Sequence, residues 1–284
     1  MPRDFLHNHP QFADLIRIVA EVKSIDPAPA EKDCWIMHCL YELRQLGHTF
    51  QLKGGTSLSK GHNIIGRFSE DIDILIEPPA DRDVKTGKNH DKPAHIQTRR
   101  DFYDWLAKTI KIDGLSKVGR DTEFDDVPKC RSAGIRLNYT SAVEAMEGLR
   151  EGVLLEVGFD TVAPNTPKDI SSWVYDYGAG KVDVTDNRAK AVPCYDPGYT
   201  LIEELQTVST KFRHQQSNGS DPVEFMRHYY DLYELLRRSE VHRYGSVQAA
   251  QGRPLSAGRQ SEHRSKRSLS LGRCQDKRPL RKSL

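Results

Sequence analysis

The feature that most restricts the fold is the alternation of Ile72, Ile74 and Ile76 with other residues, which continues until Pro78. This period of two predicts a β-strand with one apolar face, and proline ends it because proline lacks the N–H that a sheet needs. Asp71 and Asp73 then emerge on the other face, about 7 Å apart. Carboxylates this close repel each other, and a divalent cation is the commonest compensation. The alternative interpretation is that Asp71 and Asp73 lie on the solvated face of an edge strand and bind no ligand.

A glycine turn precedes this strand, in the sequence Leu52-Lys-Gly-Gly-Thr-Ser-Leu-Ser-Lys-Gly61. Gly54 and Gly55 allow the backbone to approach a ligand closely, and residues 56 to 60 suit a short helix whose first amides point at an anion. A phosphate-binding turn directly before a metal-binding acid pair is what metal-assisted phosphoryl or nucleotidyl transfer requires. The two segments therefore indicate an enzyme of that class.

These segments resemble the signature of the DNA polymerase β superfamily of nucleotidyltransferases: Gly-Gly-Thr-x-Leu, a spacer, then Arg-x-Ser-x-Asp-Ile-Asp from residue 67 to 73. Within that superfamily the sequence is most similar to the AbiEii/AbiGii toxin family of bacterial type IV toxin-antitoxin systems, from about residue 30 to about residue 240. The resemblance implies an α/β (α+β) fold, with a nucleotidyltransferase-like mixed sheet and helices followed by an α-helical C-terminal half.

The resemblance also implies a ligand set. Asp71 and Asp73 would hold Mg²⁺ or Mn²⁺. Glu156 lies among apolar residues, where a lone carboxylate is costly, and is the candidate for the third acid of the superfamily. A surface glutamate on an edge strand is its alternative reading, and Asp160 is a weaker candidate. The residues that would bind the nucleoside triphosphate (NTP) are Gly54, Gly55, Thr56, Arg67, Ser69 and Lys211.

Two later helices complete the implied site. By the resemblance, Lys211 contacts the NTP phosphates, and Asp231 positions that lysine or acts as a general base. Lysine is a good point-charge ligand for phosphates. The alternative is a surface salt bridge between adjacent helices. Arg227, His228 and Tyr230 are candidates to face the same site, although a tyrosine-rich helix is usually core packing.

Periodicity divides the rest of the chain. A period near 3.6 predicts helices over residues 12–22, 30–46 and 94–112, from 200 to about 216, and from 222 onward; a period of two predicts strands between 116 and 162. Residues 77–93 are interpreted as a loop, 163–198 as a possible link between two halves, and His38 as a satisfied core histidine. The expected domains are a catalytic domain (1–165), a helical domain that completes the nucleotide site (166–240) and a basic tail (241–284).

The tail differs from the body in charge. Residues 241–284 contain 11 Lys and Arg against 2 Asp and Glu, a net of +9, so the net of +2 for the whole chain leaves about −7 for residues 1–240. Few apolar residues and no period predict disorder. Two interpretations stay open. One is a frameshifted or truncated product, because nothing there resembles the expected family continuation. The other is a basic arm for nucleic acid.

The five cysteines lack a Cys-x-x-Cys pair, which predicts free thiols in a reducing compartment. No signal peptide and no apolar run near 18 residues is visible, so a soluble cytoplasmic protein without a membrane partner is expected.

The expected reaction is transfer of a nucleoside monophosphate from an NTP, with pyrophosphate leaving and Mg²⁺ assisting. The resemblance implies a toxin that acts on RNA, at a tRNA 3′ end, restrained by a separate antitoxin protein. The acidic body does not itself suggest nucleic-acid binding. A small-molecule nucleotidyltransferase, for example one that modifies an antibiotic, is one alternative, and a non-catalytic nucleotide-binding or interaction module is another.

Overall fold

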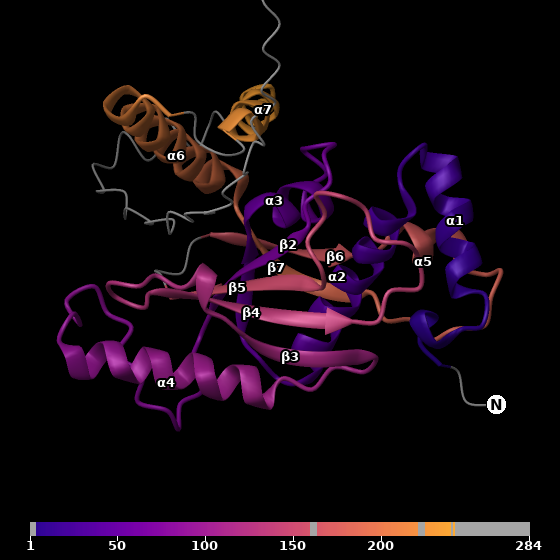
Figure 1. The fold of residues 1–284 in the computed structure, drawn as a ribbon, viewed down its shortest axis with the longest axis horizontal. Coiled ribbons are helices and arrows are strands. Elements are labelled where there is room, and N and C mark those ends of the chain that lie inside the picture. Colours follow the sequence, from indigo (N-terminus) through magenta and orange to yellow (C-terminus); the bar gives the residue numbers. More distant parts are fainter. Residues whose placement is uncertain (1–3, 160–163, 221–224, 240, 242–284) are drawn as a thin grey trace, which may run out of the picture.

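A single seven-stranded sheet organises the computed structural model, which describes residues 4–159, 164–220, 225–239 and 241 (Figure 1). The strand order is β3-β4-β5-β2-β1-β7-β6. The pairs β2·β5 and β1·β7 are parallel and the others antiparallel, so the sheet is mixed, which confirms the expected fold class. The strands are β1 (Phe50–Lys53), β2 (Asp71–Ile76), β3 (Leu115–Asp121), β4 (Ser132–Tyr139), β5 (Val153–Gly158), β6 (Asn165–Ile170) and β7 (Ala189–Tyr195).

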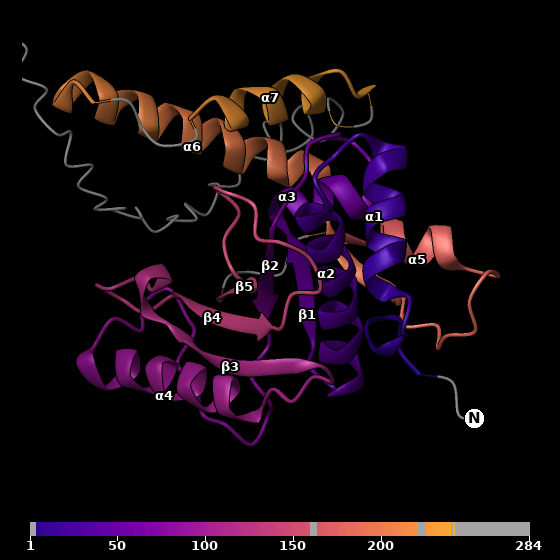
Figure 2. The same cartoon turned by 45° about the vertical axis from the view of Figure 1, so that its right-hand side comes forward.

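Helices surround this sheet. They are α1 (Phe12–Lys23), α2 (Pro27–Gln45), α3 (Gly54–Thr56), α4 (Pro93–Thr109), α5 (Trp173–Gly178), α6 (Pro197–Asn218) and α7 (Phe225–Leu236), with short turns of helix at η1 (Leu6–Asn8), η2 (Ser57–Gly61) and η3 (Thr122–Phe124). The main core lies between the isoleucine face of β2, its neighbouring strands, and the apolar sides of α2 and α4. In both views α6 and α7 lie at one end of the molecule and α4 at the other (Figures 1 and 2). None of the helices in the described ranges is long and apolar enough to cross a bilayer.

The helix boundaries follow local chemistry. α2 begins three residues earlier than its apolar pattern, because the Asp26 carboxylate accepts a hydrogen bond from the amide of Ala28 and Pro27 occupies the first turn. Gly47, with φ +79°, follows its end, where glycine adopts a left-handed conformation without strain. α4 ends at Thr109 and not at residue 112: Ile110 is already extended, with ψ 116°, yet it remains buried in the core.

Residues 163–198 do not form the expected link. β6 and β7 are an antiparallel pair, and β7 joins the central sheet through the pairing of Leu52 with Cys194. The alternation was hard to recognise in the sequence because Pro167 and Pro193 interrupt it, and they face each other in this pair. The sheet thus continues to Tyr195, and the helical part begins with α6 instead of at residue 166.

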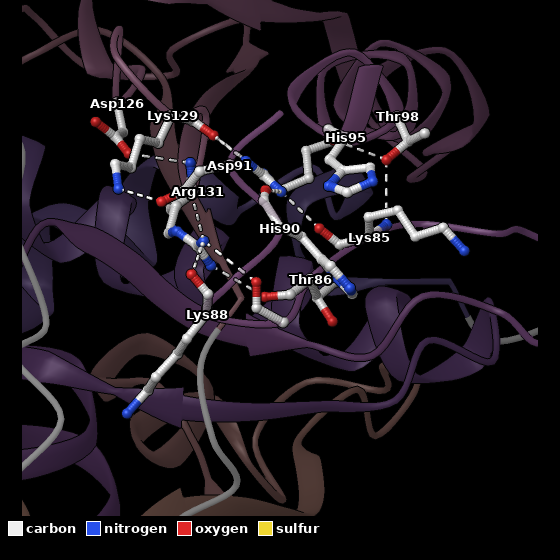
Figure 3. Close-up of polar contacts among 12 residues, drawn as sticks. Lys85, Thr86, Lys88, His90, Asp91, His95, Thr98, Asp126, Lys129 and Arg131 are labelled. Carbon is white, nitrogen blue, oxygen red and sulfur yellow. Dashed lines mark hydrogen bonds and ion pairs between the residues drawn. The ribbon is translucent and has the colours of Figure 1, made fainter. Parts of the chain in front are cut away.

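The loop predicted at 77–93 is confirmed for residues 77–92, with Pro93 already in α4. Two arginines hold this loop in place (Figure 3). The fully buried Arg99 donates to the carbonyl oxygens of Lys85, His90 and Lys129, and Arg131 donates to those of Thr86, Gly87 and Lys88 and to the carboxylate of Asp91. These guanidinium groups donate hydrogen bonds to backbone carbonyl oxygens that lie outside any helix or strand and so lack the usual backbone partners.

Several smaller predictions can be checked. Four cysteines, Cys34, Cys39, Cys130 and Cys194, are free and buried, as expected, while Cys274 lies outside the described residues. His38 is a satisfied core histidine, hydrogen-bonded to the side chain of Asn187 and the carbonyl oxygen of Asp113. The predicted tail, residues 241–284, lies outside the described residues except for Val241, and so does the weaker third-acid candidate Asp160.

Candidate active site

The acid cluster consists of Asp71, Asp73 and Glu156 and lies on two central strands. The register of the parallel pair β2·β5 places Asp73 beside Glu156 and Asp71 beside Leu154. Residues that pair in register share a face, so the three carboxylates lie together, opposite the isoleucines. β2 lies between β5 and β1, and β5 lies between β4 and β2, so neither is an edge strand. The edge-strand alternatives for both the aspartate pair and Glu156 are therefore wrong.

The glycine turn packs directly against this cluster. Gly54 has φ +67°, and a Cβ at this position would collide with the Asp73 carboxylate, lying 3.1 Å from its Cγ. A Cβ on Gly55 would lie 2.7 Å from Ser69 Oγ and 3.0 Å from Arg67 Nη2. Gly54 needs the freedom of glycine because of its positive φ and this close approach, while a side chain at Gly55 would displace Ser69 and Arg67. The turn, the arginine, the serine and the second aspartate therefore meet as their order in the motif suggested.

The Thr56 side chain, which was expected to bind the NTP, makes a hydrogen bond within the protein. The side chain is fully buried, and its hydroxyl donates a 2.5 Å hydrogen bond to the carbonyl oxygen of Asp71. The short helix predicted at 56–60 is split between α3 and the wider turn η2. Thr56 thus ties the glycine turn to the first residue of β2.

Asp231 pairs with Arg67. Arg67 Nε lies 2.8 Å from Asp231 Oδ1, and Arg67 Nη2 lies 2.5 Å from Oδ2. Asp231 is 2% exposed and the Arg67 side chain is 25% exposed, so this two-bonded ion pair between the segment before β2 and α7 is buried on the Asp231 side. From the sequence, Asp231 was expected to position Lys211 or to act as a general base. The structure instead commits both carboxylate oxygens to the guanidinium fork, whose geometry matches a carboxylate better than an ammonium does.

Lys211 is positioned by a different chain of contacts. Its Nζ lies 2.9 Å from Nε2 of His228, and Nδ1 of His228 lies 2.7 Å from Oε2 of Glu204. His228 and Glu204 are both buried. The contacts require a neutral imidazole that donates from Nδ1 to Glu204 and accepts at Nε2 from the ammonium. The role of Glu204 was missed, although its place seven residues before Lys211, on the same side of α6, is a usable signal.

The three carboxyl groups of the acid cluster all have raised pKa values, because neighbouring cations offset only part of the effect of burial and mutual repulsion. Burial raises the pKa of Asp71 to about 6, with further contributions from Glu70 and Asp73. Burial, and then repulsion from Asp73 and Asp71, raises the pKa of Glu156 to about 8. Burial also raises the pKa of Asp73, against the pull of Lys53, Arg227 and Arg67. Lys53, which pairs in register with Asp73, was not among the expected site residues.

These residues fit a hard cation. Oδ1 of Asp71 is buried and has no hydrogen-bond partner within the described ranges, which leaves a carboxylate oxygen for a proton or a metal ion. Within the same ranges no group of three or more His, Cys, Asp or Glu side chains is arranged so that it could hold a metal ion. Mg²⁺ in NTP-dependent enzymes typically takes one or two carboxylates, with substrate phosphates as further ligands. The donor chemistry and the open arrangement both suit that mode.

A comparison with protein families agrees with the motifs. A family model described as "Nucleotidyl transferase AbiEii toxin, Type IV TA system" matches residues 36–264, well over half of the chain. The match extends past residue 240, where the sequence analysis saw the family likeness end. One similar solved structure is that of an antigenic nucleotidyltransferase-like protein from Paracoccidioides brasiliensis; it covers 78% of this chain and 89% of its own, with 13% identity and a TM-score of 0.40. No curated protein matches the sequence.

Proposed function

The chain belongs to the AbiEii family of nucleotidyl transferase toxins from type IV toxin-antitoxin systems, and we propose that it moves a nucleoside monophosphate from an NTP to an acceptor hydroxyl in a Mg²⁺-dependent reaction. The acceptor in this proposal is RNA, at a tRNA 3′ end, and a separate antitoxin protein restrains the enzyme. The cytoplasmic location expected from the sequence stays a prediction.

The observation that carries the proposal is the contact between Gly54 and the Asp73 carboxylate. A turn without side chains lets the Asp73 carboxylate approach its backbone closely, and the neighbouring acids are suited to the cation that accompanies a triphosphate. Transfer from an NTP needs these two elements within a few ångströms of each other, and here no side chain separates them.

The residues have separable tasks. Asp71, Asp73 and Glu156 hold Mg²⁺, which when bound neutralises charge at the α-phosphate and lowers the pKa of the attacking hydroxyl. The backbone of Gly54 and Gly55 and the hydroxyl of Ser69 border the phosphates. Lys211, oriented by His228 and Glu204, supplies a positive charge to them.

Asp231 acts mainly as an anchor in this proposal. Both of its oxygens accept hydrogen bonds from Arg67, and the side chain is 2% exposed, so its contacts suit a positioning residue. Its task is to hold Arg67 beside Gly55, where the guanidinium reaches the nucleotide site. The positioning role expected for Asp231 is kept, with Arg67 in place of Lys211 as the residue it positions.

Exposed side chains on α7 support a nucleic-acid acceptor. Tyr229 and Tyr233 are 41% and 58% exposed, and Arg237 lies over the ring of Tyr233 at 5.4 Å. Exposed aromatic rings interleaved with arginine are typical of surfaces that bind single-stranded nucleic acid, where bases stack on the rings.

The test is a labelling assay with the full-length protein, Mg²⁺ and each labelled NTP in turn, with total tRNA or a panel of small hydroxyl compounds as acceptor. Label in RNA with one or two NTPs, absent from Asp73→Asn, supports the proposal. Label only in a small molecule would establish a small-molecule nucleotidyltransferase instead. NTP binding without label in any acceptor would favour a non-catalytic module.

A further inference from the structure

A buried ion pair fixes the backbone of Arg150 at both its amide and its carbonyl. The Lys32 side chain is fully enclosed, and its Nζ donates to the carbonyl oxygen of Arg150 at 2.9 Å and to Oε2 of Glu70 at 2.8 Å. The amide of Arg150 donates to the same Glu70 oxygen at 3.3 Å. Burial lowers the pKa of Lys32, so enclosing this lysine costs free energy. The arrangement holds the main chain at position 150 beside the residue that immediately precedes Asp71.

The side chain of Arg150 reaches the acid cluster from this anchor. Its Nη1 lies 3.3 Å from Oδ2 of Asp71 and 3.7 Å from Oε1 of Glu70. The Arg150 side chain is 41% exposed, whereas that of Asp71 is 15% exposed. The guanidinium is therefore the more solvent-exposed partner of this pair.

The contact between Arg150 and Asp71 is weak compared with the other arginine pair of the site. Arg67 binds Asp231 through two bonds of 2.8 and 2.5 Å. Arg150 instead makes one long hydrogen bond to Asp71, a 3.7 Å contact with Glu70 and a cation–π contact with the ring of Phe124. Solvent screens the Arg150 side of this pair, because the Arg150 side chain is 41% exposed. A divalent cation at Asp71 displaces such a partner readily. Because the backbone stays fixed, the freed guanidinium remains next to the site, and its planar fork matches phosphate oxygens.

We propose that Arg150 is a substrate-binding residue with two positions: it neutralises Asp71 before the metal ion binds, and it turns to the polyphosphate of the NTP afterwards. This inference rests on the proposed function, since it presupposes a metal ion and an NTP at the acid cluster. The expected signature is a pair of opposite effects. Removing the guanidinium frees Asp71 for the metal ion, and it deprives the phosphates of a ligand.

The experiment is calorimetric titration of the full-length protein, first with Mn²⁺ alone and then, at saturating Mn²⁺, with the α,β-methylene analogues of the four NTPs. For Arg150→Gln we expect Mn²⁺ to bind about threefold more tightly, because an exposed competing cation is gone. The NTP analogue should bind about tenfold more weakly to Arg150→Gln at saturating Mn²⁺, because the charge-assisted contact between the guanidinium and the phosphates is lost. Arg150→Lys should keep wild-type Mn²⁺ affinity and lose part of the analogue affinity, since an ammonium competes for Asp71 but lacks the fork.

Arg188→Gln is the matched control. The side chain of Arg188 is 40% exposed and binds a carboxylate, that of Asp186, so the variant removes an equally exposed guanidinium whose partner is not in the acid cluster. Neither affinity should change in it.

Two failures are distinguishable. If wild-type protein binds neither Mn²⁺ nor any analogue, the proposed function falls and this inference falls with it. If wild-type protein binds both, and Arg150→Gln leaves either affinity unchanged or weakens both together, only the role of Arg150 is overturned. A loosened loop would weaken both affinities, so opposite effects cannot come from a structural defect alone.

Discussion

Arg67 and Asp231 are 164 positions apart in the sequence, yet two hydrogen bonds of 2.8 and 2.5 Å join them. A second contact lies next to this pair, since the amide of Gly66 donates to the hydroxyl of Tyr230 at 3.0 Å. The segment that leads into β2 is therefore attached to α7 at two consecutive residues on each side. The helical part thus holds the arginine of the motif in place.

Arg67→Ala should be strongly destabilising. It leaves the buried Asp231 carboxylate without its two-bonded cation, and breaking a buried pair from one side costs about 3 kcal/mol of unfolding free energy. The double variant Arg67→Ala/Asp231→Ala should lose less than the sum of the two single losses. Urea denaturation measures both quantities. Arg17→Ala, which removes an exposed partner of Asp14, is the control and should change stability by no more than about 0.5 kcal/mol. Additive losses would mean that the pair contributes no coupling.

Asp73→Asn should abolish nucleotidyl transfer and leave the fold intact. Losing a metal ligand removes several kcal/mol of transition-state stabilisation. In metal-free protein the same change should raise the melting temperature, because the charge on Asp73 is one of the causes that raise the pKa of Glu156. Turnover assays and thermal unfolding without divalent ions check the two effects. Activity within a few-fold of wild type would remove Asp73 from the metal site.

Gly54→Ala should cost more stability than Gly219→Ala, although the two glycines have nearly the same backbone conformation, with φ +67° and +66°. At Gly219 a Cβ meets open space, so only the strain of a left-handed alanine remains, about 1 kcal/mol. At Gly54 the methyl group also collides with the Asp73 carboxylate. The double variant Gly54→Ala/Asp73→Ala should recover part of the loss. Equal unfolding free energies for the two single variants would argue against close packing of turn and acid.

Lys211→Ala should weaken NTP binding and leave Mg²⁺ binding unchanged. The ammonium supplies charge to phosphates, while the carboxylates hold the metal ion. Glu204→Gln should produce a smaller loss of the same kind, because it weakens the orientation of His228, which holds Lys211 in place. Separate titrations with Mg²⁺ and with NTP distinguish the two. If NTP affinity and turnover were both unaffected in Lys211→Ala, the residue would be an ordinary surface lysine.

The metal-free protein should lose stability as pH rises from about 4 to about 8. The pKa of Asp71 is raised from 3.8 to about 6 and that of Glu156 from 4.5 to about 8. Between the ordinary pKa and the raised pKa of each group, the folded state binds more protons than the unfolded state. The unfolding free energy therefore falls as the pH rises through that interval. Asp91 titrates outside this window, because hydrogen bonds from Lys129 and Arg131 hold its pKa at about 2.

Thermal unfolding across this range measures the slope. Glu156→Gln should flatten the part above pH 6, and the stabilisation by Mg²⁺ should increase over the same interval as the carboxylates lose their protons. A melting temperature independent of pH between 4 and 8 would show that the pKa values of Asp71 and Glu156 are not raised in the folded protein.

The sequence alone determined the parts of the fold that depend on neighbouring residues. The alternation around Ile72 and Ile74 predicted β2 and placed Asp71 and Asp73 on one face, as the structure confirms. The proposed family also followed from a local motif, and the family match confirms it. Strand alternation, helix caps and turn glycines are short-range signals, readable because each depends on conformations within a few residues.

Only the tertiary structure decided which distant residues meet. Strand register places Glu156 beside Asp73. Packing of the helices and loops pairs Asp231 with Arg67, Lys211 with His228, and Arg150 with Asp71. Several cations in the sequence were plausible partners for each carboxylate. The choice among them depends on which helix face packs onto which strand, and that packing is set by burial of apolar surface over the whole chain rather than by local sequence.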